Sequence, residues 1–342
     1  MMLKKKEINE IREHLERAKN PVFYYDNDCD GLCSFILLRK LIGRGKGVVI
    51  RNYPDLNASY AHKARELNAD YVFVLDKPLI SMEFVQEIKE LGIPLVWIDH
   101  HHMEEEAEFD KLENVFVYKG DEPTTAIAYS VSGRKEDLWL ALIGCVSDHF
   151  MPKFAKEFAK EHPELWKKGI KEPFEAYFET GLGNIARALN FGLKDSITNV
   201  VQMQNHLIEC KSASDVLEEV NSNLALRKKY KELREKYNAL LERAKNEVSG
   251  KLIFFSYSGE MSLSAELSNE LIHIYPDKYV VIAYLRQGLV NLSLRGKKVL
   301  KIFEKLKGEI SGLEGGGHED AVGGRVSAGE LDNFKKALEK LL

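Results

Sequence analysis

The chain has 342 residues, enough for two domains that each bury a sizeable core. Its 49 basic and 53 acidic side chains give a formal charge of −4, which excludes a global positive field, so any polyanion must be held locally. The four cysteines form no CxxC pair, which excludes a zinc ribbon and favours a reducing compartment. No long apolar segment follows the amino terminus, so we expect a cytoplasmic protein that does not enter a membrane.

The first part of the chain predicts a parallel α/β sheet. Residues 1–19 read as a charged amphipathic helix. Strands and helices then alternate from residue 21 to about residue 148, a pattern typical of a parallel sheet. Apolar runs at residues 22–25, 71–75, 94–98 and 139–147 read as buried parallel strands or buried helices, and those at 71–75 and 94–98 are rich in β-forming residues.

Each of these four runs ends in acidic residues. In chain order they are Asp26, Asp28 and Asp30, then Asp76, then Asp99 with His100 and His101, and finally Asp148. Two carboxylates about 4 Å apart repel by roughly 4 kcal/mol near a protein surface, so a cluster persists when it is protonated or holds cations. The first segment alone also fits a solvated turn. Because ligands of open α/β sheets bind beyond the carboxyl ends of the strands, the four ends together predict a two-metal site.

The second part of the chain predicts a helical region and another α/β unit. Residues 150–210 read as helices that support the first domain, interrupted by glycines 181 and 183. Residues 214–248 read as one long charged helix, whose apolar stripe packs on its own domains or serves self-association. Strands at 251–255, 279–285 and 289–294 follow, with a hairpin turn at Gln287-Gly288. We therefore expect domains at 1–210 and 251–342, joined by a helical linker at 211–250.

Several of these segments resemble the motifs of one family in order and spacing. Asp28-Cys29-Asp30-Gly31, Asp76, Asp99-His100-His101 and Asp148 resemble the four successive motifs of the DHH phosphoesterase superfamily. Asn291–Arg295 and Gly315-Gly316-Gly317-His318 resemble its DHH-associated C-terminal domain. The resemblance covers residues 20 to 330. The motif pattern is most similar to that of RecJ-like single-strand exonucleases and of the smaller NrnA-like enzymes. It implies a parallel-sheet domain and a smaller mixed-sheet domain, with the active site in the cleft between them.

The resemblance also implies ligands for two Mn²⁺ ions, with Mg²⁺ as an alternative. Asp28 would ligate one ion, Asp30, His100 and Asp148 the other, and Asp76 would bridge both. Two such ions lower the pKa of a bound water toward about 7, which supplies hydroxide for attack on phosphorus.

Other residues would act on the substrate. Asp99 would orient the neighbouring imidazoles, and His101 would lie near the scissile phosphate as a hydrogen-bond donor or an acid. Arg295 and His318 would contact the substrate phosphate, because a guanidinium fork can bind two phosphate oxygens at once. Gly315, Gly316 and Gly317 would let the backbone approach that phosphate closely.

Two positions depart from the family pattern. Tyr24 stands where many members have a histidine, so Asp26 is predicted to supply the missing ligand, as in RecJ-like patterns. Lys77 follows Asp76 where a smaller residue is commoner. It reads as a surface turn residue, with a position beside the metals or the phosphate as the alternative. Cys29 and Cys145 lie beside the predicted site and are expected to serve packing.

The sequence thus predicts a Mn²⁺-dependent phosphodiesterase, an exonuclease that releases mononucleotides from single-stranded DNA or RNA in repair or turnover. The chain ends soon after the glycine motif, so no additional oligonucleotide-binding barrel is expected, and 3′→5′ polarity is favoured. Alternative substrates are short oligonucleotides, cyclic dinucleotides and 3′-phosphoadenosine phosphate. The alternative class of function is a non-catalytic adaptor of replication or repair. The filled ligand positions argue against it. A homo-oligomer and a repair or replication partner such as a helicase remain open.

Overall fold

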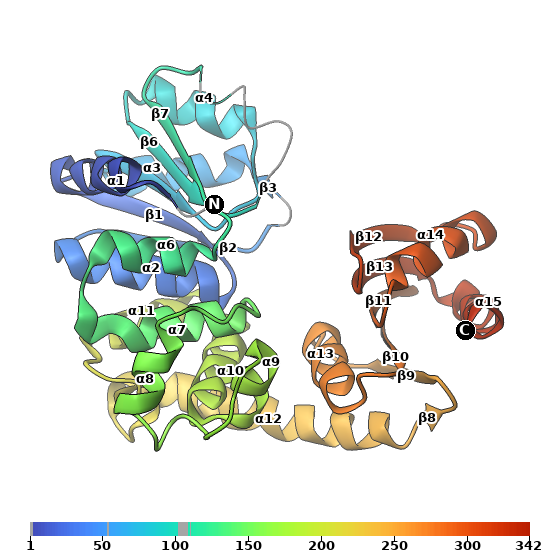
Figure 1. The fold of residues 1–342 in the computed structure, drawn as a ribbon. Coiled ribbons are helices and arrows are strands. Elements are labelled where there is room, and N and C mark those ends of the chain that lie inside the picture. Colours follow the sequence, from blue (N-terminus) through green and yellow to red (C-terminus); the bar gives the residue numbers. More distant parts are fainter. Residues whose placement is uncertain (1–2, 53–54, 102–108, 110) are drawn as a thin grey trace. The chain divides into compact units, whose positions relative to one another are not determined.

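The computed structural model of the chain describes residues 3–52, 55–101, 109 and 111–342 (Figure 1). It divides into two compact units, one that ends at Tyr230 and one from Lys231 to Leu342. The division falls inside the segment predicted as a linker, within helix α12 (Leu224–Lys245). The predicted domain limits and the predicted cleft between the domains stay predictions. No helix in the described part of the chain is long and apolar enough to cross a bilayer.

The described part of the first unit contains a parallel sheet with the strand order β2-β1-β4-β6-β7. These strands, with a separate short pair, are β1 (Pro21–Asp26), β2 (Lys46–Ile50), β4 (Tyr71–Leu75), β6 (Leu95–Asp99) and β7 (Val115–Lys119), and the pair β3 (Asp55–Leu56) and β5 (Leu79–Ile80). The helices of this unit are α1 (Lys5–Arg17), α2 (Cys29–Ile42), α3 (Ala61–Glu66), α4 (Met82–Glu90), α6 (Thr124–Ser132), α7 (Leu138–Ser147), α8 (Ala155–Glu161), α9 (Pro173–Glu179), α10 (Gly181–Leu193) and α11 (Ile197–Glu209).

Alternate residues of the strands enter two different hydrophobic cores. Phe23 and Tyr25 of β1 pack in a core with residues of α1, α2, α6 and α7, whereas Val22 and Tyr24 pack in a second core with residues of α3 and α4 (Figure 1). Successive strand side chains point to opposite faces, so a sheet covered on both faces needs an apolar residue at every position. This confirms the buried parallel sheet that the continuous apolar runs predicted.

The fourth apolar run forms a helix, α7, whose residues from Leu138 to Val146 are all buried. At Gly144 a Cβ atom would lie only 2.2 Å from Oγ1 of Thr125 in α6, so the glycine lets these two helices pack very closely. Asp148 therefore follows a buried helix, whereas the other acidic segments follow strands.

The helical region differs from the predicted pattern at two places. Gly183 does not interrupt a helix but lies in the first turn of α10, where a Cβ atom would meet the carbonyl oxygen of Tyr177 at 2.1 Å. The long helix predicted from residue 214 begins only at Leu224. Before it the chain forms two short 3-10 helices, in which the Asn223 amide donates to the carbonyl of Val216 at 3.0 Å. Such side-chain bonds to backbone compete with a continuous helix.

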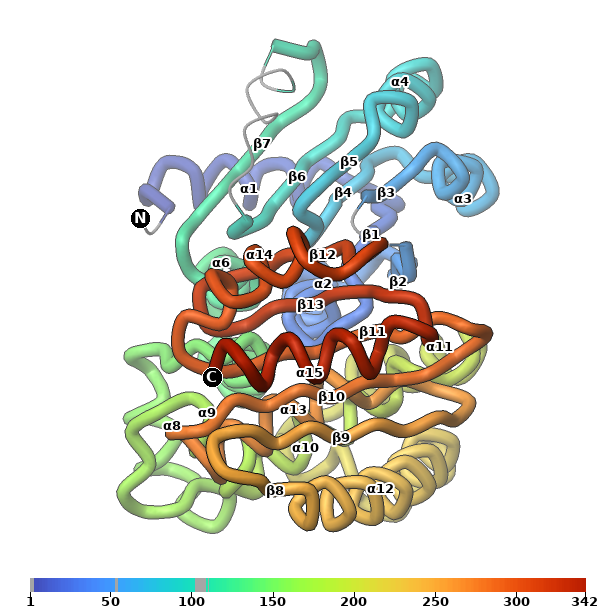
Figure 2. Tube along the Cα trace, turned by 90° about the vertical axis from the view of Figure 1, so that its right-hand side faces the viewer, coloured from blue at the N-terminus to red at the C-terminus, as the bar shows by residue number. Residues whose placement is uncertain are grey.

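The second unit contains a mixed sheet with the strand order β12-β13-β11-β10-β9-β8, and Figure 2 shows these strands side by side in this order. Its elements are β8 (Val248–Ser249), β9 (Leu252–Ser258), α13 (Ser264–Ile274), β10 (Tyr279–Arg286), β11 (Leu289–Arg295), α14 (Val299–Glu309), β12 (Glu314–His318), β13 (Ala321–Ser327) and α15 (Leu331–Leu341). Strands β9 and β10 are parallel and the other pairs are antiparallel. Gln287 and Gly288 both have positive φ, 52° and 78°, which confirms the predicted hairpin turn.

Candidate metal centre

The first acidic segment is folded tightly around the start of α2. Asp26 ends β1, and the carboxylate of Asp28 caps α2 by accepting the N–H of Gly31 at 2.9 Å. A Cβ atom at Gly31 would lie 2.6 Å from the carbonyl oxygen of Asp26, so only glycine permits this close approach of helix to strand. Asp30 is buried in the first turn of α2, where the positive end of the helix dipole favours a carboxylate.

Two threonines at the start of α6 hold the buried carboxylates in place. Both oxygens of Asp30 accept backbone N–H groups, from Thr124 at 2.9 Å and from Thr125 at 2.7 Å. The Thr124 hydroxyl also lies 3.2 Å from Oδ1 of Asp76 and donates to it. The sequence analysis missed these two residues. The sequence pattern that could have identified them is a proline followed by two threonines before an apolar run, which indicates the start of a helix.

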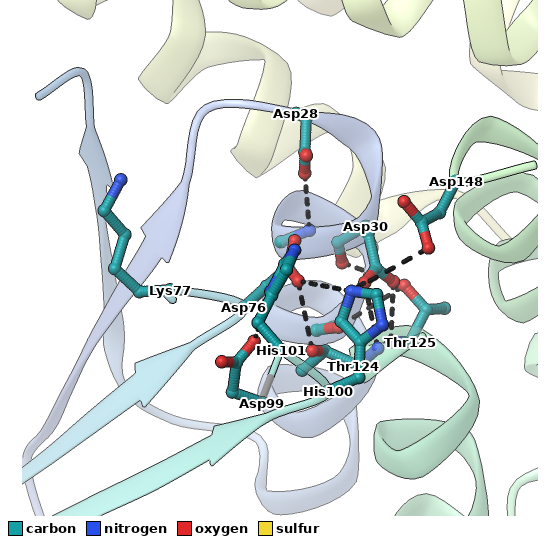
Figure 3. A network of polar contacts seen from close by, with 12 residues as sticks. Asp28, Asp30, Asp76, Lys77, Asp99, His100, His101, Thr124, Thr125 and Asp148 are labelled. Carbon is teal, nitrogen blue, oxygen red and sulfur yellow. Dashed lines mark hydrogen bonds and ion pairs between the residues drawn. The ribbon is translucent and has the colours of Figure 1, made fainter. Parts of the chain in front are cut away.

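Three carboxylates and one imidazole converge at the carboxyl edge of the sheet (Figure 3). The Nε2 atom of His100 lies 3.4 Å from Oδ1 of Asp76, 3.7 Å from Oδ2 of Asp30 and 3.8 Å from Oδ2 of Asp148. This Nε2 atom is buried and makes no hydrogen bond to any described residue. A buried polar atom of this kind calls for a partner, and the surrounding carboxylates indicate a cation.

The electrostatics of the cluster fit a cation. Burial, with added repulsion from neighbouring carboxylates, raises the pKa of Asp28 to about 7 and of Asp148 to about 9, and raises the pKa of Asp76 well above its usual value. Burial also lowers the pKa of His100, which keeps its imidazole neutral and able to ligate. Asp76 has a φ of 57°, a left-handed conformation that is uncommon outside glycine and that clusters at functional sites. Carboxylate oxygen with neutral imidazole is a donor set suited to Mn²⁺ or Mg²⁺.

The predicted ligands fall into two overlapping groups. One group of atoms within 4.8 Å of one another comes from Asp30, His100 and Asp148, and the other comes from Asp76, Asp99, His100 and His101. Asp26 and Asp28 lie outside both groups as the described side chains stand. Their coordination of a metal therefore stays a prediction.

Asp99 is a buried anchor for His101. Its carboxylate accepts Nδ1–H of His101 at 2.9 Å and the ammonium of Lys119 at 2.6 Å. Burial alone would raise the pKa of Asp99, but the bond from His101 and the charge of Lys119 outweigh it and lower the pKa. Burial likewise acts to lower the pKa of His101, but Asp99 outweighs it and raises that pKa. The arrangement favours a protonated His101, and Lys119 was not identified from the sequence.

Lys77 is not the surface turn residue that the sequence favoured. Its side chain is fully buried, and its ammonium lies 2.7 Å from Oδ1 of Asp26 and 2.6 Å from the carbonyl oxygen of Asn52. The alternative, a position beside the metals or the phosphate, stays a prediction, because Asp26 lies outside both groups of converging atoms. One oxygen of Asp26 is therefore engaged by an internal ammonium.

The predicted substrate residues lie in the second unit. Arg295 ends β11, donates Nε–H to Oδ1 of Asn269 in α13 at 2.7 Å, and has its pKa lowered to about 10 by burial. His318 is exposed at the end of β12. The three glycines form β12 itself, and a Cβ atom at Gly315 would meet the carbonyl oxygen of Gly323 at 2.2 Å. The backbone contact that requires this glycine is thus with β13, and the phosphate contacts stay a prediction.

Comparison with known proteins places the chain in a family. The model of the DHH family N-terminal domain matches residues 22–146, and the model of the DHHA1 domain matches residues 249–342. No curated protein was found to match the chain in sequence. The buried carboxylate–histidine cluster, whose atoms could hold a metal ion, lies in the unit that contains the DHH match. The chain belongs to the DHH phosphoesterase superfamily and carries its DHHA1 domain.

Solved structures share this fold at low sequence identity. RecJ from Thermus thermophilus in complex with Mn²⁺ matches with a TM-score of 0.65 and 14% identity over all of this chain and 55% of that chain. An exonuclease RecJ bound to manganese matches with 0.64 and 15%, over 100% and 95% of the two chains. The pGpG-specific phosphodiesterase PggH from Vibrio cholerae matches with 0.51 and 13%, over 94% and 97%. The chain thus spans little more than half the length of the Thermus RecJ chain.

Proposed function

We propose that the chain is a Mn²⁺-dependent exonuclease that releases mononucleotides from single-stranded DNA or RNA, with 3′→5′ polarity. The observation that carries the metal dependence in this proposal is the unbonded Nε2 atom of His100 among the carboxylates of Asp30, Asp76 and Asp148. Two similar folds, both RecJ, were solved with manganese, and the Thermus protein was also solved with Mg²⁺. These matches support the choice of metal.

The chain's own residues supply positioning and a proton. Asp30, Asp76, His100 and Asp148 would hold the metal, which when bound acts as a Lewis acid and activates water. The N–H groups of Thr124 and Thr125 fix both oxygens of Asp30 before metal or substrate arrives. The protonated imidazole of His101, oriented by Asp99, would donate to the oxygen that leaves phosphorus.

Short substrates are the second candidate. The PggH match covers 94% of this chain and 97% of that one, so the two proteins share a fold of similar extent. With a formal charge of −4 the chain also has no overall positive field to hold a long polyanion. Short oligonucleotides, cyclic dinucleotides and 3′-phosphoadenosine phosphate therefore belong in the same assay. Carboxylate and imidazole atoms converge in both groups as a metal site requires, which argues against a purely non-catalytic adaptor.

The test is a time course with Mn²⁺ on matched DNA and RNA strands of about 20 nucleotides, labelled at either end. Asp76→Asn is the control, because asparagine tolerates the left-handed φ of this position. A ladder from the 5′-labelled strand with immediate mononucleotide from the 3′-labelled strand would establish 3′→5′ polarity, and the opposite pattern would reverse it. Inert long strands with cleaved di- or trinucleotides would favour the second candidate. Wild-type activity in Asp76→Asn would rule out this metal site.

A further inference from the structure

The free edge of the parallel sheet borders an apolar groove. Strand β2 pairs with β1 and with no other strand in the described part of the chain, so it is an edge strand. A groove of about 740 Å³ runs along it, lined by residues Gly45 to Val49 of the strand and its entry. An edge strand presents unpaired N–H and C=O groups, and proteins usually cover or blunt such an edge.

Both walls of this groove carry apolar side chains among polar ones. One wall comes from α11 and includes Ile197, Val201 and Ile208, and the opposite wall includes Tyr60 and Leu67 beside α3. Ile197 is 50% exposed and Val201 is 39% exposed, which is unusual for branched aliphatic side chains. Exposed apolar residues gathered in one groove, and not scattered singly, mark an interaction site.

The polar lining of the groove is basic. Arg39, Lys46, His62 and Lys63 line it, and no aspartate or glutamate does. Lys63 forms an ion pair with Glu66 at 2.6 Å, and Glu209 adds a negative charge near Arg39. Exposed Lys46 makes no ion pair with a described residue, so it is the cation that the groove offers in a chain of formal charge −4. It favours an acidic occupant.

The walls separate a peptide from a nucleic acid. Single-stranded nucleic acid is held by aromatic side chains on which the bases stack. Here the exposed wall side chains, Ile197 and Val201, are aliphatic. Of the aromatic lining residues, Phe35 is buried and Tyr60 is half-buried, with its hydroxyl accepting the N–H of Arg51 at 3.0 Å. Apolar walls on both faces of a free strand edge match an added strand, whose side chains point alternately to the two faces.

We propose that this groove binds an extended segment of a partner protein, one that alternates apolar and acidic residues and adds a strand to β2. Main-chain hydrogen bonds to the free edge would give affinity, and the two apolar walls with their basic rim would give specificity. The lining of the groove includes none of the predicted metal ligands, and the proposal does not depend on the substrate of the enzyme.

The test begins with selection of displayed random peptides of about 12 residues on the full chain. A fluorescein-labelled synthetic peptide of the most enriched sequence is then titrated against three proteins, the wild type, Val201→Glu and Ile274→Glu. Ile274 is the matched control, because it is a branched aliphatic residue of the same 39% exposure on α13 of the second unit. We expect enriched peptides with the alternating pattern, and about a tenfold loss of affinity in Val201→Glu alone. Circular dichroism melts confirm that both variants fold.

Three outcomes would overturn the proposal. The first is the absence of alternating apolar and acidic peptides after selection, and the second is equal peptide affinity in Val201→Glu and wild type. The third comes from a fluorescein-labelled oligothymidylate. If Val201→Glu weakens its binding and Ile274→Glu does not, the groove holds nucleic acid. The charge-reversing variant Lys46→Glu is a separate check, because it should lower the affinity for the peptide without altering either apolar wall.

Discussion

The ammonium of Lys77, fully buried, lies 2.7 Å from the carboxylate of Asp26, which is 24% exposed. The two residues are 51 positions apart and belong to the ends of neighbouring strands β1 and β4. The pair gives the acidic centre an internal positive charge at its rim. Because the two partners differ in exposure, the cost of removing each one should also differ.

We predict that Asp26→Asn destabilises the metal-free chain more than Lys77→Met. The first change leaves a fully buried ammonium without its carboxylate, which costs about 3–5 kcal/mol of unfolding free energy. The second leaves a carboxylate that water partly reaches, so it should cost less. Urea denaturation measures both. Lys236→Met, which breaks an exposed pair with Glu232, should leave the free energy of unfolding nearly unchanged. An equal cost of Asp26→Asn and Lys77→Met would contradict the buried pair.

The metal-free chain should lose stability as the pH rises from about 5 to about 8. The folded pKa values of Asp28 and Asp148, about 7 and about 9, lie above the ordinary value of 3.8. In this range the folded chain binds more protons than the unfolded chain, so the free energy of unfolding falls as pH increases. Added Mn²⁺ should therefore raise Tm more at the higher pH, because it replaces the lost protons.

The control for this pH effect is Asp148→Asn, which removes one titrating carboxyl and should flatten the fall in Tm. Buried His14, whose pKa is lowered, acts in the opposite direction below pH 6.5, so the comparison between wild type and variant isolates the cluster. An unchanged slope in Asp148→Asn would show that this carboxyl is already ionised without metal.

His101→Gln should lower kcat by about 100-fold with little change in bound Mn²⁺, because the imidazole is placed to donate a proton. Asp99→Asn should act through the same group, since it removes the acceptor that orients Nδ1. Rate measurements are paired with metal analysis by mass spectrometry. Loss of metal in His101→Gln would instead make His101 a ligand, in keeping with its place in the second group of converging atoms.

Arg295→Ala should raise KM for the oligonucleotide without lowering the bound metal, because the predicted phosphate contact lies outside the carboxylate cluster. Arg295→Lys should recover only part of the affinity, since lysine lacks the two-pronged guanidinium. Arg325→Ala is the matched control, an exposed arginine on the neighbouring strand β13. Steady-state kinetics separate KM from kcat. If Arg325→Ala has the same effect as Arg295→Ala, general positive charge and not a specific contact explains it.

Local pattern was sufficient for the strands and their acidic ends. The runs before Asp26, Asp76 and Asp99 are continuous and apolar because the sheet is covered on both faces, and their carboxyl ends share one edge. The hairpin at Gln287-Gly288 was equally readable, since a two-residue turn with positive φ has its own residue preference. These features depend on spacings of a few residues.

Other features depended on partners distant in the chain. The apolar run before Asp148 was open between strand and helix, because residues buried on every side show no period. Helix α12 begins at Leu224 and not at residue 214 as predicted, because side-chain hydrogen bonds stabilise the preceding turns. The residues around Thr124 indicated a helix start but not its bonds to Asp30 and Asp76, and Lys119 gave no signal as a partner of Asp99.

Motifs and apolar runs were enough to predict the family, the two α/β units and the order in which acidic residues reach one edge of a sheet. The partners that neutralise Asp26 and Asp99 depend instead on contacts between elements distant in the chain. Asp99 meets Lys119 because β6 and β7 are neighbours, and Asp26 meets Lys77 because β1 and β4 are neighbours. Burial at those contacts sets the cost of an unpaired charge, and burial follows from the packing of whole elements. The neighbours of each aspartate in the sequence therefore predict neither its partner nor its burial.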